Sequence, residues 1–357
     1  MQQVFYPVKV WLVTGIFMVF IQILVGGITR LTESGLSITK WEVVSGTLPP
    51  MSDASWQLEF EKYKDTPQYK EINEGMSLSQ FKFIYFWEYI HRLWARFMGF
   101  VFIIPFMFFY RKRWIIPPLM KDLGIVILLA ALAAVFGWVM VASGLINRPW
   151  VNAYKLSIHL IIAFSVIAYL FWTFLKYSEG YPADRNIKRE NVDKLAIILF
   201  VALFLIQLVL GGMMSGMKVA VVYPEWPLMN GVFWPEILND GSQWTWSNLN
   251  HYDQNEFAPA FTHFFHRLTA YLLCIVFVFL LVRFWSNAHV GKNMWQYRFS
   301  ILAIGGALLL QATLGIFTVL HSLGSVPVFL GVAHQAGAVI VMGTIIYFIF
   351  TLKKEVD

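Results

Sequence analysis

Residues 10–29 read VWLVTGIFMVFIQILVGGIT, an apolar run without a single charged side chain. A helix of about 20 apolar residues is long enough to cross the hydrocarbon core of a bilayer. The whole chain shares this character, since 58% of its 357 residues are hydrophobic and only 13% are charged. Soluble domains carry about 25% charged residues. The composition therefore excludes a water-soluble globular protein and predicts an integral membrane protein.

Seven further apolar runs follow the first one. They cover approximately Phe83–Phe109, Gly124–Leu145, Leu156–Leu175, Leu195–Met213, Ala258–Val282, Phe299–Leu320 and Val328–Leu352. Residues 299–352 hold no charge at all and are too long for one crossing, so we divide them at the turn signal Ser325-Val326-Pro327. The first run is too long for a signal peptide, and no small-residue cleavage site follows it. We expect an all-α integral membrane protein with eight transmembrane helices.

Lysine and arginine are shared unequally between the two sides of these helices. Fifteen lie on the side that holds both chain ends, and nine lie on the other side in longer loops. Positively charged loops favour the cytoplasm, so we expect both termini inside and the long loop 30–82 outside. The net charge of +6 then reflects membrane topology, and no nucleic-acid partner is expected. Since no transit-like leader is visible, we favour a bacterial cytoplasmic membrane over an organelle.

Three motifs recur in the same order along the chain. IQILVGG at 21–27 matches IQLVLGG at 206–212, EYIHR at 88–92 matches HFFHR at 263–267, and His159 matches His334. The offsets of 185, 175 and 175 residues indicate two copies of a four-helix unit. We expect an N-terminal half at 1–176, a cytoplasmic linker at 177–193 and a C-terminal half at 194–357. The two tandem four-helix bundles should be related by a pseudo-twofold axis along the membrane normal, as parallel repeats are.

Four histidines occupy matched places in these spans: His91, His159, His266 and His334. Histidine in a membrane span is costly and indicates a function by default, although each could also be a hydrogen-bonded core residue. All four should lie within about 15 Å of the outer boundary, on helices that point the same way. Two such imidazoles can bind one iron from opposite faces of a haem inside a helix bundle. We therefore predict two haem sites, one in each half.

Charged residues beside these histidines differ between the two halves. Arg92 and Arg267 each follow a proposed ligand and could bind haem propionates, or could instead bond a loop carbonyl. Glu88 stands where the second copy has His263. It could pair with Arg92 one turn further on, but an acid near a membrane site usually has a chemical role. This asymmetry predicts that one half reacts and the other conducts electrons.

Further segments carry a resemblance to a known family. Residues 26–37 read GGITRLTESGLS and residues 226–231 read WPLMNG, in addition to EYIHR at 88–92. At these residues the chain resembles the haem A synthases, over nearly its whole length. Some relatives carry a cysteine pair in an outer loop. The one cysteine of this chain, Cys274, lies in a predicted span, so a thiol relay is not expected.

The resemblance implies an enzyme that oxidises a methyl group of haem O to the formyl group of haem A. It implies that His266 and His334, with Arg267, hold a resident haem b. It likewise implies that His91 and His159, with Arg92, hold the substrate haem, and that Glu88 is the catalytic residue beside the methyl group. Haem O synthase and cytochrome oxidase assembly proteins are the implied partners, alongside membrane lipid, and an oligomer is compatible with this.

The chemistry can be argued from the ligand set. If two imidazoles fill both axial positions, the iron has no vacancy for dioxygen. Removal of electrons followed by attack of water is then favoured, with Glu88 stabilising positive charge or accepting a proton. Two alternatives stay open: a di-haem b-type electron-transfer cytochrome, and a haem transporter or chaperone. Neither needs an unmatched glutamate beside one haem.

Overall fold

A computed structural model describes residues 4–39, 48–147, 149–179, 191–286 and 294–354, which form helices and no strand. Eight of these helices are long and apolar enough to cross a membrane, which confirms the predicted all-α membrane fold. They are α1 (Tyr6–Leu31), α4 (Leu78–Arg111), α5 (Pro117–Asn147), α6 (Ala153–Ser178), α7 (Asn191–Gly216), α10 (Phe257–Ser286), α11 (Met294–Leu320) and α12 (Val328–Lys354).

The helix ends extend a few residues beyond the apolar runs, because polar caps rather than hydrophobicity set them. α4 begins at Leu78, where Ser77 and Gln80 form a reciprocal capping box. α11 ends at Leu320 and α12 begins at Val328, directly after Pro327. The predicted division of the long uncharged segment is therefore confirmed.

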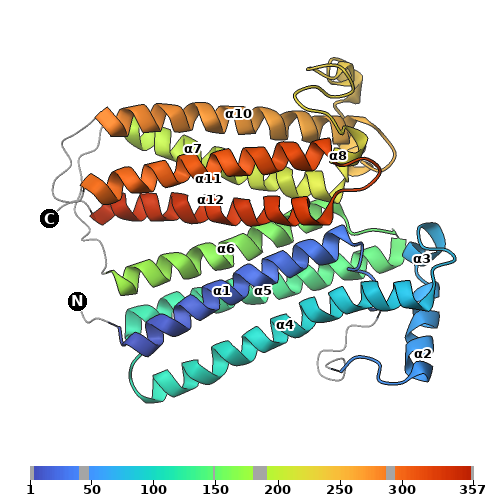
Figure 1. Ribbon diagram of the computed structural model, residues 1–357, viewed down its shortest axis with the longest axis horizontal. Coiled ribbons are helices and arrows are strands. Elements are labelled where there is room, and N and C mark those ends of the chain that lie inside the picture. The colour runs from blue at the N-terminus through green and yellow to red at the C-terminus, as the bar shows by residue number, and fades with distance from the viewer. Residues whose placement is uncertain (1–3, 40–47, 148, 180–190, 287–293, 355–357) are drawn as a thin grey trace. The chain divides into compact units, whose positions relative to one another are not determined.

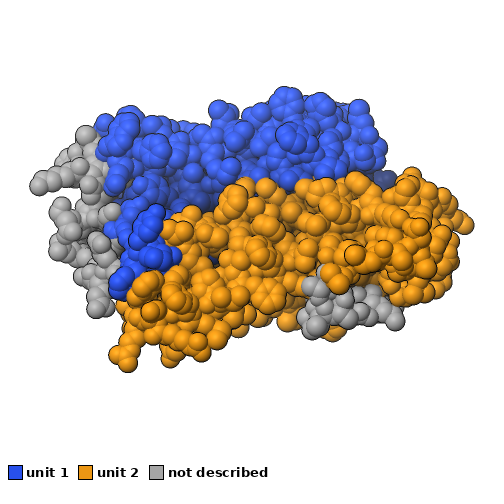
Figure 2. All heavy atoms as spheres, turned by 60° about the horizontal axis from the view of Figure 1, so that its bottom comes forward, with its two compact units in different colours: residues 1–9, 168–357 blue, residues 10–167 orange. Residues whose placement is uncertain are grey.

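The chain divides into two compact units, coloured separately in Figure 2. One unit comprises Val10–Ile167, and the other comprises Met1–Lys9 together with Ala168–Asp357. The predicted halves at 1–176 and 194–357 and their symmetry axis stay predictions. Most of the predicted linker at 177–193 falls on residues 180–190, which lie outside the described residues.

In the unit Val10–Ile167, α1 and α4 run antiparallel and are joined by side-chain hydrogen bonds to backbone carbonyls. The donor and acceptor pairs are Trp11 to Val101 at 3.0 Å, Trp94 to Met18 at 3.0 Å, Gln22 to His91 at 3.2 Å and Thr29 to Trp87 at 3.2 Å. Buried polar side chains in such helices need partners, and each of these bonds also fixes the register. The bonds place the C-terminal part of α1 against the part of α4 that carries His91.

The N-terminal end of α4 is covered by two short helices, α2 (Asp53–Lys64) and α3 (Pro67–Glu71). Figure 1 shows α2 lying across this end of α4. A core of Phe60, Tyr63, Phe81, Ile84 and Tyr85 joins them. This aromatic cluster explains why α4 starts well before the predicted span.

Tyr63, within this cluster, is fully buried. Its hydroxyl donates to Gln68 at 3.0 Å and accepts from Asn73 at 2.7 Å. Burial raises the pKa of Tyr63 to about 12. Gln68 in turn donates to the carbonyl of Glu33 at 2.9 Å, which ties α3 to the loop after α1.

In the second unit, α7, α10, α11 and α12 run side by side (Figure 1). α7 packs against α10, and α11 packs against α12. Residues 217–256 form a long connection between α7 and α10 that contains the short helices α8 (Val219–Val222) and α9 (Trp246–Asn250) and two 3-10 turns, η2 (Glu236–Leu238) and η3 (Gly241–Gln243). Arg267 of α10 reaches this loop.

Candidate functional site

The structure brings the four histidines together as two pairs. His91 of α4 lies close enough to His159 of α6 for their imidazoles to interact electrostatically. The same holds for His266 of α10 and His334 of α12. His159 and His334 each lie six residues after the start of their helix, so the two occupy equivalent places in α6 and α12. The pairing is the one that the sequence predicts.

Glutamine side chains lie beside the imidazole rings of the second pair. Nε2 of Gln207 lies 3.1 Å from Nε2 of His266, and Nε2 of Gln311 lies 3.5 Å from Nε2 of His334. Neutral imidazole is the form that binds a metal, through either ring nitrogen.

The surrounding donor set also fits a haem better than a compact metal centre. Within the described ranges, no group of three or more His, Cys, Asp or Glu side chains could enclose a metal ion. Nδ1 of His159, His266 and His334 is buried without a hydrogen-bond partner of good geometry. Two imidazoles without further protein ligands match an iron whose other four positions come from a porphyrin.

Glu88 is held by groups from two segments of the chain. It is 3% exposed. Its Oε1 accepts from Arg92, one turn further along α4. Its Oε2 accepts from the hydroxyl of Ser37 at 2.7 Å and from the backbone N–H of Ile38 at 2.8 Å. The ion pair between Glu88 and Arg92, which was one interpretation of the sequence, is present. The loop after α1 adds two further donors to the Glu88 carboxylate.

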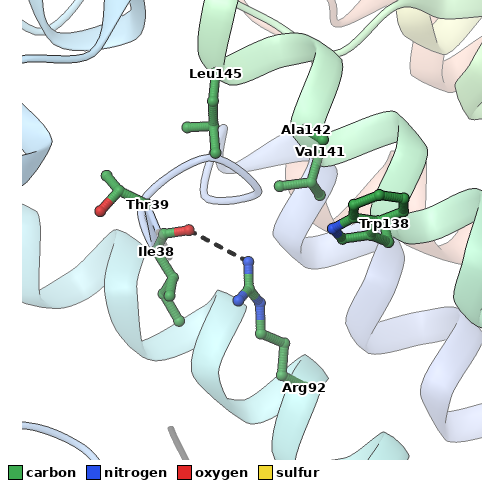
Figure 3. A pocket seen from close by; sticks show the side chains of 7 residues that line it. All are labelled: Ile38, Thr39, Arg92, Trp138, Val141, Ala142 and Leu145. Carbon is green, nitrogen blue, oxygen red and sulfur yellow. Dashed lines mark hydrogen bonds between the residues drawn. The ribbon is translucent and has the colours of Figure 1, made fainter. Parts of the chain in front are cut away.

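A cavity of about 160 Å³ opens beside this ion pair (Figure 3). Figure 3 shows the Arg92 side chain pointing between the loop after α1 and the facing side of α5. The lining residues are Ile38, Thr39, Arg92, Trp138, Val141, Ala142 and Leu145. The volume holds several water molecules, and its polar edge is formed by Arg92 and the loop.

The matching place in the second unit is built differently. His263, three residues before His266, is buried, and its ring stacks on Tyr223 with centroids 5.9 Å apart. Arg267 donates to the carbonyls of Pro227 and Phe233, the second at 2.6 Å. The structure therefore shows Arg267 bonded to loop carbonyls, and its contact with a haem stays a prediction.

Several residues of the site were not predicted from the sequence. Ser37 and Ile38 lie in or next to the segment 26–37, but no spacing rule connects them to Glu88. Gln311 has no counterpart in the first half, where Phe136 stands 175 residues earlier. Cys274 lies within α10, as expected.

Sequence comparison adds the family. The model of a family described as cytochrome oxidase assembly protein matches residues 9–346. The chain belongs to this cytochrome oxidase assembly protein family.

Relatives of this chain match it over nearly its whole length. A protein named heme A synthase from Parvibaculum lavamentivorans is 40% identical, over 96% of this chain and 94% of its own. Proteins of the same name from Rickettsia bellii and Flavobacterium psychrophilum are 38% and 37% identical, each over 97% of this chain and 98% of their own. The resemblance read from the sequence motifs is confirmed, and the chain is a multi-pass membrane protein of this family.

Proposed function

We propose that this protein, like the relatives named heme A synthase, makes haem A, and that it does so as an oxidoreductase that converts haem O. The observation that carries the proposal is the asymmetry of two similar imidazole pairs. Glu88, bonded by Arg92, Ser37 and Ile38, lies one turn before His91. His263 stands in its place before His266. A pure electron carrier has no use for this difference.

The two pairs take different roles in the proposal. His91 and His159 hold the substrate haem O, with Arg92 beside it, and His266 and His334 hold a haem b. When bound, haem b supplies one-electron chemistry that carries electrons away from the substrate site. Arg267 holds the loop at 217–256 through the carbonyls of Pro227 and Phe233 and would supply a positive charge for a propionate of this haem.

Glu88 acts as a fixed negative charge beside the methyl group that reacts. Its carboxylate is oriented by donors on both oxygens, so little reorganisation accompanies the reaction, and positive charge that develops at the methyl carbon is stabilised. The same engagement disfavours a role as proton acceptor. The cavity beside Arg92 has room for the attacking water.

The proposed chemistry balances in two rounds. In each round one C–H bond of the methyl carbon breaks and one C–O bond to a water oxygen forms. Two electrons leave, together with one proton from the carbon and one from the water. The first round gives an alcohol, and the second gives a hydrated aldehyde that loses water to leave the formyl group. The four electrons leave through haem b to an external acceptor.

The proposal includes a place in the cell. The lysine and arginine distribution supports cytoplasmic termini in a bacterial cytoplasmic membrane. The loops at 32–77 and 217–256 then face outward. Haem O synthase would supply the substrate, and cytochrome oxidase assembly proteins would receive the product.

Pigment extraction tests the function directly. The chain is expressed in cells that make haem O but have no other route to haem A, and the extracted haems are identified by mass. The formyl product is expected from the parent chain. A di-haem cytochrome or a haem transporter would leave haem O unchanged, and that result would overturn the proposal.

A variant tests the role of the acid. Glu88→Gln keeps the size of the side chain and removes its charge, so we expect the yield of haem A per protein to fall about 100-fold. The resident haem should stay in place. Glu61→Gln on the exposed face of α2 is the matched control. A Glu88→Gln protein with normal turnover would refute the electrostatic role.

A further inference from the structure

Each of the four histidines lies against a glycine of the preceding long helix. A methyl group placed on Gly315 would come within 2.8 Å of Cε1 of His334, and one on Gly137 would come within 3.0 Å of Cε1 of His159. The distance from Gly211 to Cε1 of His266 would be 3.4 Å. At Gly315 the approach is closer than real Cβ atoms show, so only glycine leaves the ring where it is. At Gly137 a methyl group would displace the ring by a few tenths of an ångström, and at Gly211 it would only touch the ring.

The histidine nearest Gly26 is turned differently. A methyl group there would meet Nε2 of His91 at 3.1 Å, instead of the Cε1 and Nδ1 edge. Gln22, four residues before Gly26, donates to the backbone carbonyl of His91 at 3.2 Å. The inference below therefore concerns His159, His266 and His334.

These three rings share a second contact. Each lies against the backbone carbonyl of the residue four positions before its glycine: Ala133 for His159, Gln207 for His266 and Gln311 for His334. In an α-helix that carbonyl already accepts from the N–H of the glycine. A side chain on that residue would cover the preceding turn, so glycine leaves the carbonyl open to a second donor.

The ring atom available for this carbonyl is Nδ1. It is buried in all three histidines, and no hydrogen bond of good geometry satisfies it. In the tautomer that carries its proton on Nδ1, each of these rings can donate to this carbonyl. A small rotation of the ring completes the bond to the carbonyl.

We propose that Gly137, Gly211 and Gly315, each with the carbonyl four residues earlier, form backbone seats that orient three haem-ligating imidazoles. Each seat directs Nδ1–H at the helix carbonyl and leaves Nε2 for the iron. A ligating histidine that donates its other ring N–H is held in one tautomer and is a stronger base. The glycines are positioning residues, and the inference rests on the haem-binding roles given above.

The seats are tested on the resident haem by Gly211→Ala and Gly315→Ala in the purified full-length protein. The readouts are haem b per protein, the low-spin EPR signal of an iron with two imidazole ligands, and the reduction potential. We expect about 10-fold weaker haem retention in Gly315→Ala and a smaller loss in Gly211→Ala, where the added methyl group only touches the ring. In protein that still holds haem, loss of the Nδ1 bond weakens the ligand and should raise the potential.

Gly306→Ala is the matched control. Gly306 lies on α11 nine residues before Gly315, which places it on the opposite face, and a methyl group there meets nothing within 4 Å. It should keep the haem content, EPR signal and potential of the parent. If Gly211→Ala and Gly315→Ala also match the parent in all three readouts, the seats do not exist.

Two further variants distinguish the loss of a seat from a folding defect and from an incorrect assignment of the haem site. Gly137→Ala should keep the resident haem, which reports correct folding, and lose bound haem O about 10-fold. His334→Ala should lose the resident haem. If His334→Ala retains it, the proposed haem site fails. If His334→Ala loses it while Gly315→Ala behaves as the parent, only the seat fails.

Discussion

The hydroxyl of Ser37 donates a hydrogen bond of 2.7 Å to Oε2 of Glu88, although 51 residues separate the two in the chain. The backbone N–H of Ile38 donates to the same oxygen. The loop after α1 therefore fixes the direction of a carboxylate that belongs to α4. Arg92, on the same helix as Glu88, donates to the other oxygen of the carboxylate.

Removing the Ser37 donor should slow the reaction without emptying the second haem site. A hydrogen bond to a charged group contributes about 1.5–3 kcal/mol, so Ser37→Ala should lower turnover of haem O roughly 10-fold. Haem b content should not change. Ser165→Ala is the control, because that hydroxyl bonds only the carbonyl of Ile161 in its own helix at 2.9 Å. Equal turnover of the two variants would contradict the role of the loop.

The two histidine pairs should differ in what their loss removes. His266→Ala should leave the purified protein without its resident haem, because one axial ligand cannot hold a low-spin iron with two imidazole ligands. His91→Ala should keep that haem and lose the formation of haem A. His321→Ala, an exposed residue whose ring bonds the carbonyl of Phe317, should do neither. Loss of the resident haem in His91→Ala would reverse the assignment of the two sites.

Arg267 should stabilise the outer loop of the second unit. Its side chain is 5% exposed and bonds the carbonyls of Pro227 and Phe233. Arg267→Ala should lower the free energy of unfolding by about 3 kcal/mol and increase hydrogen exchange across residues 224–245. Arg111→Ala, at the exposed end of α4, is the control. Loss of haem b with an unchanged exchange pattern would instead show that Arg267 serves the haem alone.

The α2–α3 cluster should weaken at high pH through Tyr63. Burial raises the pKa of its phenol from 10.0 to about 12. Between these values the unfolded chain releases the proton and the folded chain keeps it, so stability is complete below pH 10 and falls toward pH 12. Hydrogen exchange of α2 measured from pH 9 to 12 should show this loss, and Tyr63→Phe should reduce the dependence. Tyr110→Phe, an exposed tyrosine at the end of α4, should leave the dependence unchanged.

Local sequence was enough for the spans and for the choice of histidines. An uncharged run such as residues 10–29 has one stable state in a bilayer, because only a helix satisfies its backbone there. Pro327 likewise shows where residues 299–352 divide into two spans, because the turn signal at this proline is a local feature of the sequence. His91, His159, His266 and His334 are conspicuous because imidazole in a span is costly, and their repeat in order gave the pairing that the structure shows.

The contacts around those histidines could not be predicted from the sequence and are known only from the tertiary structure. Whether Arg267 meets a carbonyl or a propionate depends on where a loop 34 to 40 residues away returns, and no period in the sequence encodes that path. Ser37 reaches Glu88 only after α1 and α4 pack in register. The closeness of Gly315 to His334 depends on how α11 and α12 approach each other, since a missing side chain acts only through the neighbour that fills its space.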